Sequence, residues 1–586
     1  MQSSNAKERQ GWDWAGLAWL FLFFWYFSGV TQVLIQLTGT NGFTSFRQAF
    51  LVSGLWLIPV LLFPSKTKSI AGGIGIVLWL TSLIGLGYFC IYGQQFSQSV
   101  IFIMFESNMA ESTEYFGQYF VWWMVPVYLI YTLGAWLIWR KVRPLHSGKS
   151  QSYALAVILA LSLIGYPAVR EYQKSGPTQA AIDKFEGRFE PAVPWQLVVG
   201  YNKYRKQLEN MNTLLEGNAK LAPLTNMVEA RADQPSTLVL VIGESTNRQR
   251  MSLYGYNRET TPELDKLRDQ LQVFDNVVTP RPYTIEALQQ VLTFADENNP
   301  DGYLSTPSII NMMEQAGYKT FWITNQQTMT KRNTMLTTFS KQTDEQVYLN
   351  NNLNQNARQY DGDVLKPFNK ALTDKAPRKL IVVHLLGTHM RYKYRYPEEF
   401  EKFTDNSGVP KWVTEDQLPT YNSYDNAVLY NDFVVSSLIK EFSASQPDGF
   451  LLYLSDHGEA VFDSADGGVI GRNEGKPTAP MYTIPFIVWA SDKWKQHSSF
   501  DFKSMLSRPY SSANLIHTWA DLAGLSFGEL DKSKSLISDQ FTVRPQIIGD
   551  PSQPKSLIDF SMIKTRKSHP APDEQVSNQP LIKSGT

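Results

Sequence analysis

The sequence predicts a membrane protein with two parts: five transmembrane helices, followed by an exported α/β domain with a largely parallel central sheet. Three observations support this fold class. Long apolar, aromatic-rich runs dominate the chain up to about Val169, whereas residues beyond about Gly187 have the composition of an ordinary soluble protein. Basic residues are concentrated in alternate loops between the apolar runs. From Ser236 onward, apolar runs alternate with amphipathic stretches, as is typical of α/β domains.

Five apolar segments are candidates to span a membrane. A spanning helix needs roughly 20 apolar residues, so three segments are long enough alone and the second and fifth require flanking residues. The first is too long and too aromatic for a cleaved signal peptide, and no small-residue cleavage site follows it. Buried helices of a soluble domain are the alternative, which several such runs in one stretch disfavour. The segments are Ala15–Gln36, Ala49–Phe63, Ile70–Gly93, Gln118–Trp139 and Tyr153–Val169.

The distribution of lysine and arginine predicts the orientation of these spans. The loop with Arg47 carries little positive charge, and no basic residue lies between Gln94 and Gly117. The N-terminal segment and the other two loops are basic, through Lys7, Arg9, Lys66, Lys68, Arg140, Lys141, Arg143 and Lys149. Because basic loops stay inside, the N-terminus is expected inside and everything after Arg170 outside, which in a bacterium is the periplasm.

Charge and cysteine content exclude some classes of function. The chain has 586 residues, and its 54 lysines and arginines balance its 54 aspartates and glutamates. There is therefore no overall electrostatic case for binding nucleic acid. Cys90, in the third span, is the single cysteine. The exported part therefore relies on no disulfide and has no cysteine nucleophile.

We predict four regions: a transmembrane domain (1–170), a juxtamembrane linker with amphipathic helices (171–235), an exported α/β domain (236–564) and a disordered tail (565–586). The tail is polar and contains proline. Helices are expected at Thr284–Ala295, Ser308–Ala316 and Tyr424–Phe442. Strands are expected at Leu238–Ile242, Val273–Val278, Thr320–Thr324, Leu380–Leu386, Gly449–Leu454 and Ile484–Trp489.

Residue types that bind metals follow three of the predicted strands. Glu244 follows the first strand, Asp456-His457-Gly458-Glu459 follows another, and a third carries His384 with His389 shortly after it. Sites in open α/β sheets form outside the carboxyl ends of the strands, and mixed oxygen and nitrogen ligands suit zinc or another first-row divalent ion. A helix-capping carboxylate, or a loop histidine paired with its neighbour, is the alternative for each motif alone.

Thr284 opens a predicted helix after Thr279-Pro-Arg-Pro-Tyr. The free amides and dipole of a helix N-terminus favour an anion such as phosphate. A threonine hydroxyl is a weak nucleophile, but bound to a divalent metal it can ionise near neutral pH and attack phosphorus. The alternative is a simple capping threonine, which the local sequence alone favours.

Several longer motifs occur in a fixed order along the chain. Glu244-Ser245 precedes Ser252-Leu-Tyr-Gly-Tyr-Asn-Arg258-Glu-Thr260-Thr261-Pro262, and His384…His389 precedes Arg395-Tyr396-Pro397 and Asp456–Glu459. Together with the five-span N-terminal part, these motifs resemble the phosphoethanolamine transferases of the sulfatase/alkaline-phosphatase superfamily. The resemblance covers nearly the whole chain.

The resemblance implies a set of site residues. One catalytic Zn²⁺ would be bound by Glu244, Thr284, Asp456 and His457, with Thr284 as the nucleophile. His389 would contact the transferred phosphate or act as acid for the leaving group, and His384 and Lys331 are further candidates to contact substrate. In the outward loop Ser97–Tyr115, an ethanolamine ammonium or a second metal would be held by Glu106, Asn108, Glu111 and Glu114. A solvated acidic loop is the alternative for these four residues.

Details of the motifs are most similar to the CptA-type branch, which modifies a heptose of the lipopolysaccharide core. They are Pro280-Arg-Pro-Tyr-Thr284, His384-Leu-Leu-Gly-Thr-His389 and Gly471-Arg-Asn-Glu. The chain departs from the lipid A-modifying branch because it has no exported cysteines. It also has no histidine between Asp463 and Pro480, where that branch usually carries one that contacts phosphate. The expected substitutes are Asn473, Glu474 and Lys476.

The implied reaction has two steps in a multi-pass protein of the bacterial inner membrane. Thr284 takes phosphoethanolamine from phosphatidylethanolamine, and an acceptor on lipopolysaccharide then takes it from Thr284. Alternatives are transfer to lipid A or a periplasmic glucan, phosphoglycerol transfer, ester hydrolysis, and a non-catalytic membrane-anchored binding protein. Sulfate-ester hydrolysis is disfavoured because the segment around Thr284 lacks the Cys/Ser-x-Pro-x-Arg pattern that typical sulfatases require.

Overall fold

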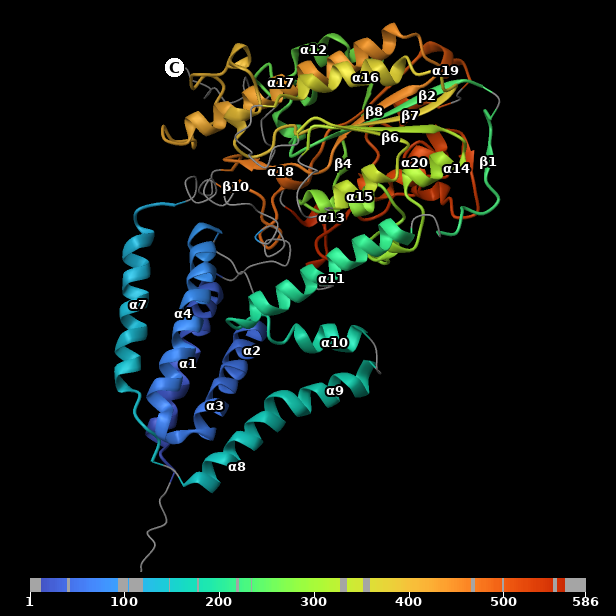
Figure 1. Ribbon diagram of the computed structural model, residues 1–586. Coiled ribbons are helices and arrows are strands. Elements are labelled where there is room, and N and C mark those ends of the chain that lie inside the picture. The colour runs from blue at the N-terminus through green and yellow to red at the C-terminus, as the bar shows by residue number, and fades with distance from the viewer. Residues whose placement is uncertain are drawn as a thin grey trace, which may run out of the picture. The chain divides into compact units, whose positions relative to one another are not determined.

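The computed structural model forms two compact units, Met1–Gln207 and Leu208–Thr586 (Figure 1). The structure describes residues 12–38, 43–92, 104, 120–146, 148–175, 179–217, 221–232, 234–326, 335–350, 359–464, 469–497, 500–551 and 556–563. Structural statements below concern these residues. The predicted tail, 565–586, lies outside them.

The N-terminal unit is helical because its apolar runs carry almost no charge and a helix satisfies its own backbone hydrogen bonds. Four helical stretches are long and apolar enough to cross a membrane: Trp14–Leu37, Phe43–Leu62, Pro64–Ile91 and Lys149–Lys174. The second and fifth predicted spans therefore do extend into flanking residues. The remaining predicted span, Gln118–Trp139, contains helix α7 (Met124–Lys141). The other helices are α1 (Trp14–Thr38), α2 (Phe43–Ser53), α3 (Leu57–Leu62), α4 (Thr67–Tyr92), α8 (Lys149–Ala160), α9 (Tyr166–Ser175), α10 (Gln179–Glu186) and α11 (Trp195–Gly217).

Aromatic residues of α1 form much of the core of this unit. Phe23, Phe24 and Phe27 are almost completely buried. Polar contacts join the neighbouring helices α4 and α7: the Tyr131 hydroxyl donates to Ser82 Oγ at 2.7 Å, and Trp79 Nε1 donates to Thr132 Oγ1 at 3.0 Å. These two hydrogen bonds fix the relative register of the two helices.

The C-terminal unit is built on a seven-stranded sheet in the order β3-β11-β8-β2-β7-β5-β6. β11 is antiparallel to both of its neighbours, and every other pairing in the sheet is parallel. The predicted largely parallel sheet is therefore confirmed. The strands are β2 (Ser236–Gly243), β3 (Leu271–Val273), β5 (Lys319–Thr324), β6 (Glu345–Tyr348), β7 (Arg378–His384), β8 (Phe450–Ser455) and β11 (Phe486–Ala490).

Helices cover both faces of the sheet (Figure 1). Leu238, Leu240 and Ile242 of β2 point into one core, with α13 (Thr284–Val291), α14 (Ile309–Gln315) and α20 (Leu515–Leu522). Val239 and Val241 point into the other, with α12 (Pro262–Lys266), α16 (Leu365–Leu372) and α17 (Leu418–Ala444). This alternation follows from the two-residue period of a strand, and a continuous apolar run is typical of a strand buried on both faces.

One predicted strand is wrong in its extent. Val273–Val278 is interrupted, because β3 ends at Val273 at the sheet edge and β4 (Val277–Val278) pairs separately with β12 (Tyr510–Ser511). Phe274 N–H still bonds to β11, at Phe486 O, but Asp275 N–H leaves the sheet and donates to Leu506 O. Shorter elements complete the unit: β1 (Val228–Glu229), β9 (Ala460–Val461), β10 (Ile470–Gly471), β13 (Leu525–Ser526), β14 (Ile547–Ile548), β15 (Ile558–Asp559), α15 (Met335–Lys341), α18 (Ala479–Tyr482) and α19 (Asp492–Gln496).

Candidate active site

The register of three parallel strands brings the predicted metal ligands together. Gly243 of β2 lies opposite Ser455 of β8, and Ile242 lies opposite His384 of β7. The next residues, Glu244 and Asp456, therefore leave the sheet side by side. Asp456 N–H donates to Gly243 O at 3.0 Å, which continues the pairing by one residue. The carboxyl edge of the sheet thus positions the site, as expected for this architecture.

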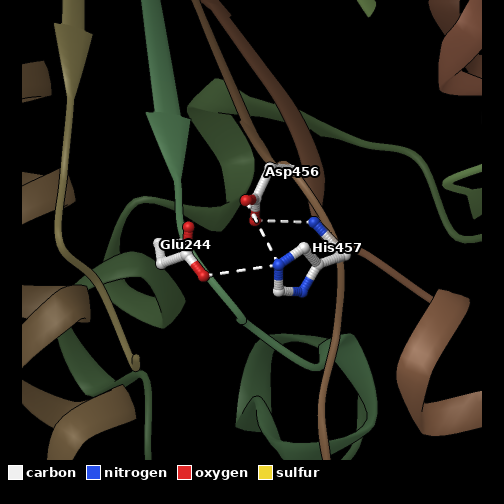
Figure 2. A group of neighbouring side chains, drawn as sticks. All are labelled: Glu244, Asp456 and His457. Atoms are coloured by element: carbon white, nitrogen blue, oxygen red, sulfur yellow. Dashed lines mark hydrogen bonds and ion pairs between the residues drawn. The ribbon is translucent and has the colours of Figure 1, made fainter. Parts of the chain in front are cut away.

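Glu244, Asp456 and His457 converge on one point (Figure 2). His457 Nε2 lies 3.3 Å from Glu244 Oε1 and 3.3 Å from Asp456 Oδ2. One ligand atom from each of the three residues lies within 4.8 Å of the others. All three side chains are almost completely buried. Such proximity of two carboxylates is costly unless a cation or a shared proton offsets their charge.

Thr284 completes this cluster from a third element. It is the first residue of α13, and its hydroxyl donates to Glu244 Oε2 at 2.9 Å. The hydroxyl oxygen of Thr284 also lies 3.2 Å from His457 Nε2. Unlike the other three side chains, Thr284 is only partly buried. Its hydroxyl can therefore meet a ligand at the rim of the cluster.

The protonation of His457 follows from its hydrogen bonds. Its Nδ1 lies 3.0 Å from Gly458 O, and a carbonyl oxygen only accepts, so Nδ1 carries the proton. The lone pair of Nε2 therefore faces the cluster. Burial, followed by the charge of Arg472, lowers the pKa of His457 below its ordinary value. A neutral imidazole whose second nitrogen is held by a carbonyl is the form that binds metals.

Asp456 presents one oxygen to the protein and one to the cluster. Its Oδ1 accepts hydrogen bonds from Ser245 N–H at 3.1 Å and His457 N–H at 2.6 Å. Its Oδ2 is buried and has no hydrogen-bond partner among the described residues. Burial, with the neighbouring charge of Glu244, raises the pKa of Asp456 well above its ordinary value. These features fit a bound cation, and two carboxylates, an imidazole and a hydroxyl form a donor set that suits Zn²⁺.

Backbone contacts from the loop after β7 hold Glu244 in place. Thr388 donates to Glu244 O through its N–H at 2.9 Å and its hydroxyl at 3.1 Å. Gly387 adopts a left-handed conformation with φ +54°, and its N–H donates to Asp361 Oδ2 at 2.7 Å. Asp361 Oδ1 also accepts from Leu386 N–H at 2.9 Å. Asp361 thus anchors the loop directly before Thr388, the residue that touches Glu244.

The two predicted histidines lie in different environments. His389 is partly exposed, and its Nδ1 is buried with no hydrogen-bond partner among the described residues. His384 is completely buried and packs edge to face on Trp322, with ring centroids 6.0 Å apart. Burial lowers the pKa of each histidine to about 4. His389 therefore remains a candidate to contact phosphate. His384, which was predicted to contact substrate, has no exposed atom that a substrate could reach.

The predicted substitutes for the missing histidine are engaged elsewhere. Glu474 forms a buried two-point ion pair with Arg281, with oxygen–nitrogen distances of 2.6 and 3.1 Å. Asn473 is buried, and its Oδ1 accepts from Lys476 N–H at 2.8 Å. The structure therefore does not bring Asn473 or Glu474 to the cluster, because each side chain is held by its own partner. Other predicted contacts lie outside the described residues: Lys331, Glu106, Asn108, Glu111 and Glu114.

Arg472, which was not predicted, reaches the cluster instead. Its Nη1 lies 2.6 Å from His457 Nε2 and 3.7 Å from Glu244 Oε1. The guanidinium also lies 6.0 Å from the centroid of the Tyr283 ring, next to Thr284. A basic residue directly before Asn473 was the signal that could have found it.

The arrangement of this sheet edge defines a class of protein. The family model described as Sulfatase matches residues 236–525, a range that contains Glu244, Thr284, Asp456 and His457. Phosphoethanolamine transferase EptC of Escherichia coli (strain K12) is 52% identical over 568 residues, which cover 96% of this chain and 98% of that protein. Phosphoethanolamine transferase CptA of Salmonella typhimurium is also 52% identical, with the same coverage. The chain belongs to the phosphoethanolamine transferase family.

A solved structure supports the same assignment for the C-terminal unit. The crystal structure of the C-terminal periplasmic domain of EptC from Escherichia coli, in complex with Zn, is 58% identical to this chain. The match covers 59% of this chain and 98% of the crystallised domain, with a TM-score of 0.58. The family resemblance found in the motifs is thus confirmed.

Proposed function

We propose that this protein transfers phosphoethanolamine from phosphatidylethanolamine to lipopolysaccharide, with a core heptose as the acceptor, through a covalent intermediate on Thr284. The observation that carries the proposal is the position of the Thr284 hydroxyl, within hydrogen-bond distance of both Glu244 and His457. Membership of a family whose relatives are named phosphoethanolamine transferases supports the chemistry.

The residues of the cluster have distinct tasks in this proposal. Zn²⁺ bound by Glu244, Thr284, Asp456 and His457 would favour the ionised threonine and offset charge on the phosphoryl oxygens. Glu244 Oε2 accepts the Thr284 hydroxyl and so orients its oxygen. The N-terminus of α13 adds amides and a dipole that favour an anion.

Each half-reaction exchanges one bond to phosphorus. In the first, a bond forms between Thr284 Oγ1 and phosphorus, and the bond to the diacylglycerol oxygen breaks. The Thr284 proton is lost and the diacylglycerol oxygen gains one. In the second, a bond forms between the acceptor oxygen and phosphorus, and the bond between phosphorus and Thr284 Oγ1 breaks. The acceptor hydroxyl loses its proton and Thr284 regains one. His389 is neutral near pH 7 because burial lowers its pKa to about 4, which favours a hydrogen bond to phosphate over acid catalysis.

The proposed location is the bacterial inner membrane, with the C-terminal unit in the periplasm. The described part of the chain contains four helices whose length and composition suit a membrane, and the corresponding domain of the Escherichia coli relative is described as periplasmic. A lipid donor requires an active site at the membrane surface. The N-terminal helices would serve to hold the enzyme there.

Incubation of the purified full chain with phosphatidylethanolamine is expected to add the mass of one phosphoethanolamine group to the peptide that contains Thr284. Peptide mass spectrometry measures this adduct. The Thr284→Ala variant should carry no adduct, because no nucleophile remains at the cluster. An unmodified Thr284 peptide in folded, zinc-loaded protein would refute the donor assignment. An adduct with the mass of phosphoglycerol, formed with phosphatidylglycerol, would identify phosphatidylglycerol as the donor instead.

Removal of zinc with a chelator is expected to lower the stability of the full chain and to abolish adduct formation. A ligand that binds the folded state alone stabilises it by roughly 4 kcal/mol at 1,000 times its Kd. Thermal unfolding in detergent, with and without added zinc, measures the shift. The Glu244→Gln variant should show a much smaller zinc-dependent shift because it lacks one anionic ligand. Equal shifts in the two proteins would place the metal elsewhere.

A further inference from the structure

Arg472 reaches the cluster through a short antiparallel hairpin. β9 follows the Asp456–Glu459 motif, and β10 pairs with it so that Gly471 lies opposite Ala460. Gly471 has a positive φ of +88°, which turns the chain at the end of β10. The next residue, Arg472, is thereby directed back toward His457, with only 13% of its side chain exposed.

The guanidinium of Arg472 is paired differently from those of Arg281 and Arg250. Arg281 holds Glu474 at two points, and Arg250 holds Asp425 through Nε at 2.9 Å and Nη2 at 2.7 Å. Among the described residues, Arg472 forms a hydrogen bond with the ring nitrogen of His457 alone. Its nearest carboxylate oxygen, on Glu244, is 3.7 Å away. Among the described residues, therefore, no carboxylate binds the Arg472 guanidinium through two hydrogen bonds.

The lone pair of His457 Nε2 can serve one partner at a time. Because Nδ1 donates to Gly458 O, Nε2 is the nitrogen available to a metal. A cation held by Glu244, Asp456 and His457 takes this lone pair, and the Nη1–H of Arg472 must then find another acceptor. The anion that the proposed reaction brings to this place is the phosphoryl group on Thr284.

We propose that Arg472 binds the non-bridging oxygens of the transferred phosphoryl group. This inference rests on the proposed function. A planar guanidinium matches two phosphoryl oxygens and remains charged throughout. Arg472 gives up no proton and forms no covalent bond. It offsets charge on oxygens that gain charge as Thr284 attacks and as the acceptor displaces it.

A buried ion pair fixes the spacing between Arg472 and the nucleophile. Arg281 lies in the loop that leads to Thr284, and Glu474 lies two residues after Arg472. Arg281 Nε and Glu474 Oε1 are 2.6 Å apart, and both side chains are 6% exposed. Asp550 approaches the same guanidinium at 3.5 Å. This ion pair joins the two loops, which holds Arg472 close to Thr284.

Binding of inorganic phosphate to the zinc-loaded full chain tests this role without the lipid donor. Arg472→Gln is expected to weaken phosphate binding by about 10- to 100-fold, the effect of losing charge-assisted hydrogen bonds. The phosphate affinity of Arg472→Lys should fall between those of the wild-type protein and Arg472→Gln, because lysine keeps the charge but lacks the planar guanidinium. The matched control is Arg544→Gln, which changes an exposed arginine that contacts Ser533 and Asp531. Calorimetric titration in detergent provides the measurement.

Two further readouts separate this role from a structural one. Zinc affinity, from competition with a chromogenic chelator, should be unchanged or higher in Arg472→Gln, because a cation near Glu244 is removed. The rate of adduct formation on Thr284 should fall at least as much as phosphate affinity. Unchanged phosphate affinity, or loss of zinc, would overturn the inference. Absence of an adduct in the wild-type protein would overturn the donor assignment alone, since the phosphate titration still tests Arg472.

Discussion

Replacement of Gly387 by alanine is expected to inactivate the protein, although Gly387 is neither a ligand nor a nucleophile. A Cβ atom at this position would lie 2.6 Å from Glu244 O and 2.8 Å from Glu244 N. Both contacts are backbone atoms, which cannot rotate away. The left-handed φ of +54° adds a penalty of about 1–2 kcal/mol for a residue with a Cβ. The loop or Glu244 must therefore shift.

A shift of Glu244 affects both metal binding and the orientation of Thr284. Its carboxylate contacts His457 and accepts the Thr284 hydroxyl. A displacement approaching 1 Å costs on the order of 100-fold in rate when it misplaces reacting groups. We therefore expect weaker zinc binding and adduct formation slowed by about that factor. Zinc content and the rate of the Thr284 adduct are the measurements.

Gly255→Ala is the matched control for Gly387→Ala. Gly255 also has a positive φ, +93°, but a Cβ there would meet no atom within 4 Å. This variant carries the conformational penalty without the clash, so it should lose stability and keep normal zinc content. If Gly387→Ala behaves like Gly255→Ala, the close approach to Glu244 is not what Gly387 provides.

Replacement of Asp425 by alanine is expected to destabilise the C-terminal unit by about 3–5 kcal/mol, the usual effect of removing one partner of a buried ion pair. Asp425 Oδ1 accepts from Arg250 Nε at 2.9 Å. Its Oδ2 accepts from Arg258 Nη1 at 2.8 Å and from the Tyr256 hydroxyl at 3.0 Å. The three charged side chains are at most 4% exposed. Without the carboxylate, two buried cations face each other with less compensation.

Denaturant unfolding of the full chain in detergent measures the effect of Asp425→Ala. The contrast is Glu263→Gln, which removes a carboxylate that is 29% exposed and pairs with Lys266 and Lys440. Exposed ion pairs contribute about 0–1 kcal/mol, so this variant should stay close to wild type. Equal losses in the two variants would show that burial of the Asp425 network does not set its contribution.

The cluster could be predicted from sequence because each of its residues follows a strongly apolar strand. Glu244 follows β2 and Asp456 follows β8, and parallel neighbours place their carboxyl ends at one edge. Thr284 required the resemblance, since a threonine at a helix start is more simply explained as a cap. The structure brings its hydroxyl to Glu244 and His457.

Other predictions failed where backbone pairing departs from the hydrophobic pattern. Val273–Val278 has the composition of one strand, yet Asp275 donates its N–H group to Leu506 O outside the sheet, and Val277–Val278 then pairs with β12. β6 was missed because its sequence, Glu345-Gln-Val-Tyr, is polar and forms a sheet edge. His384 was expected to contact substrate, but it points into the packing around Trp322.

The sequence by itself determined the fold class and the residues Glu244, Asp456 and His457 at the strand ends, because apolar periodicity and residue types at strand ends are local properties. The family came from the resemblance of longer motifs. Only the tertiary structure decided which basic or acidic residue of the 471–476 loop faces the site. Asn473 and Glu474 carry polar groups that could bind phosphate, but Lys476 N–H binds Asn473 and Arg281 binds Glu474. The β9–β10 pairing directs Arg472 to His457 instead. The direction of a loop side chain depends on contacts between segments distant in sequence, and no local pattern records those contacts.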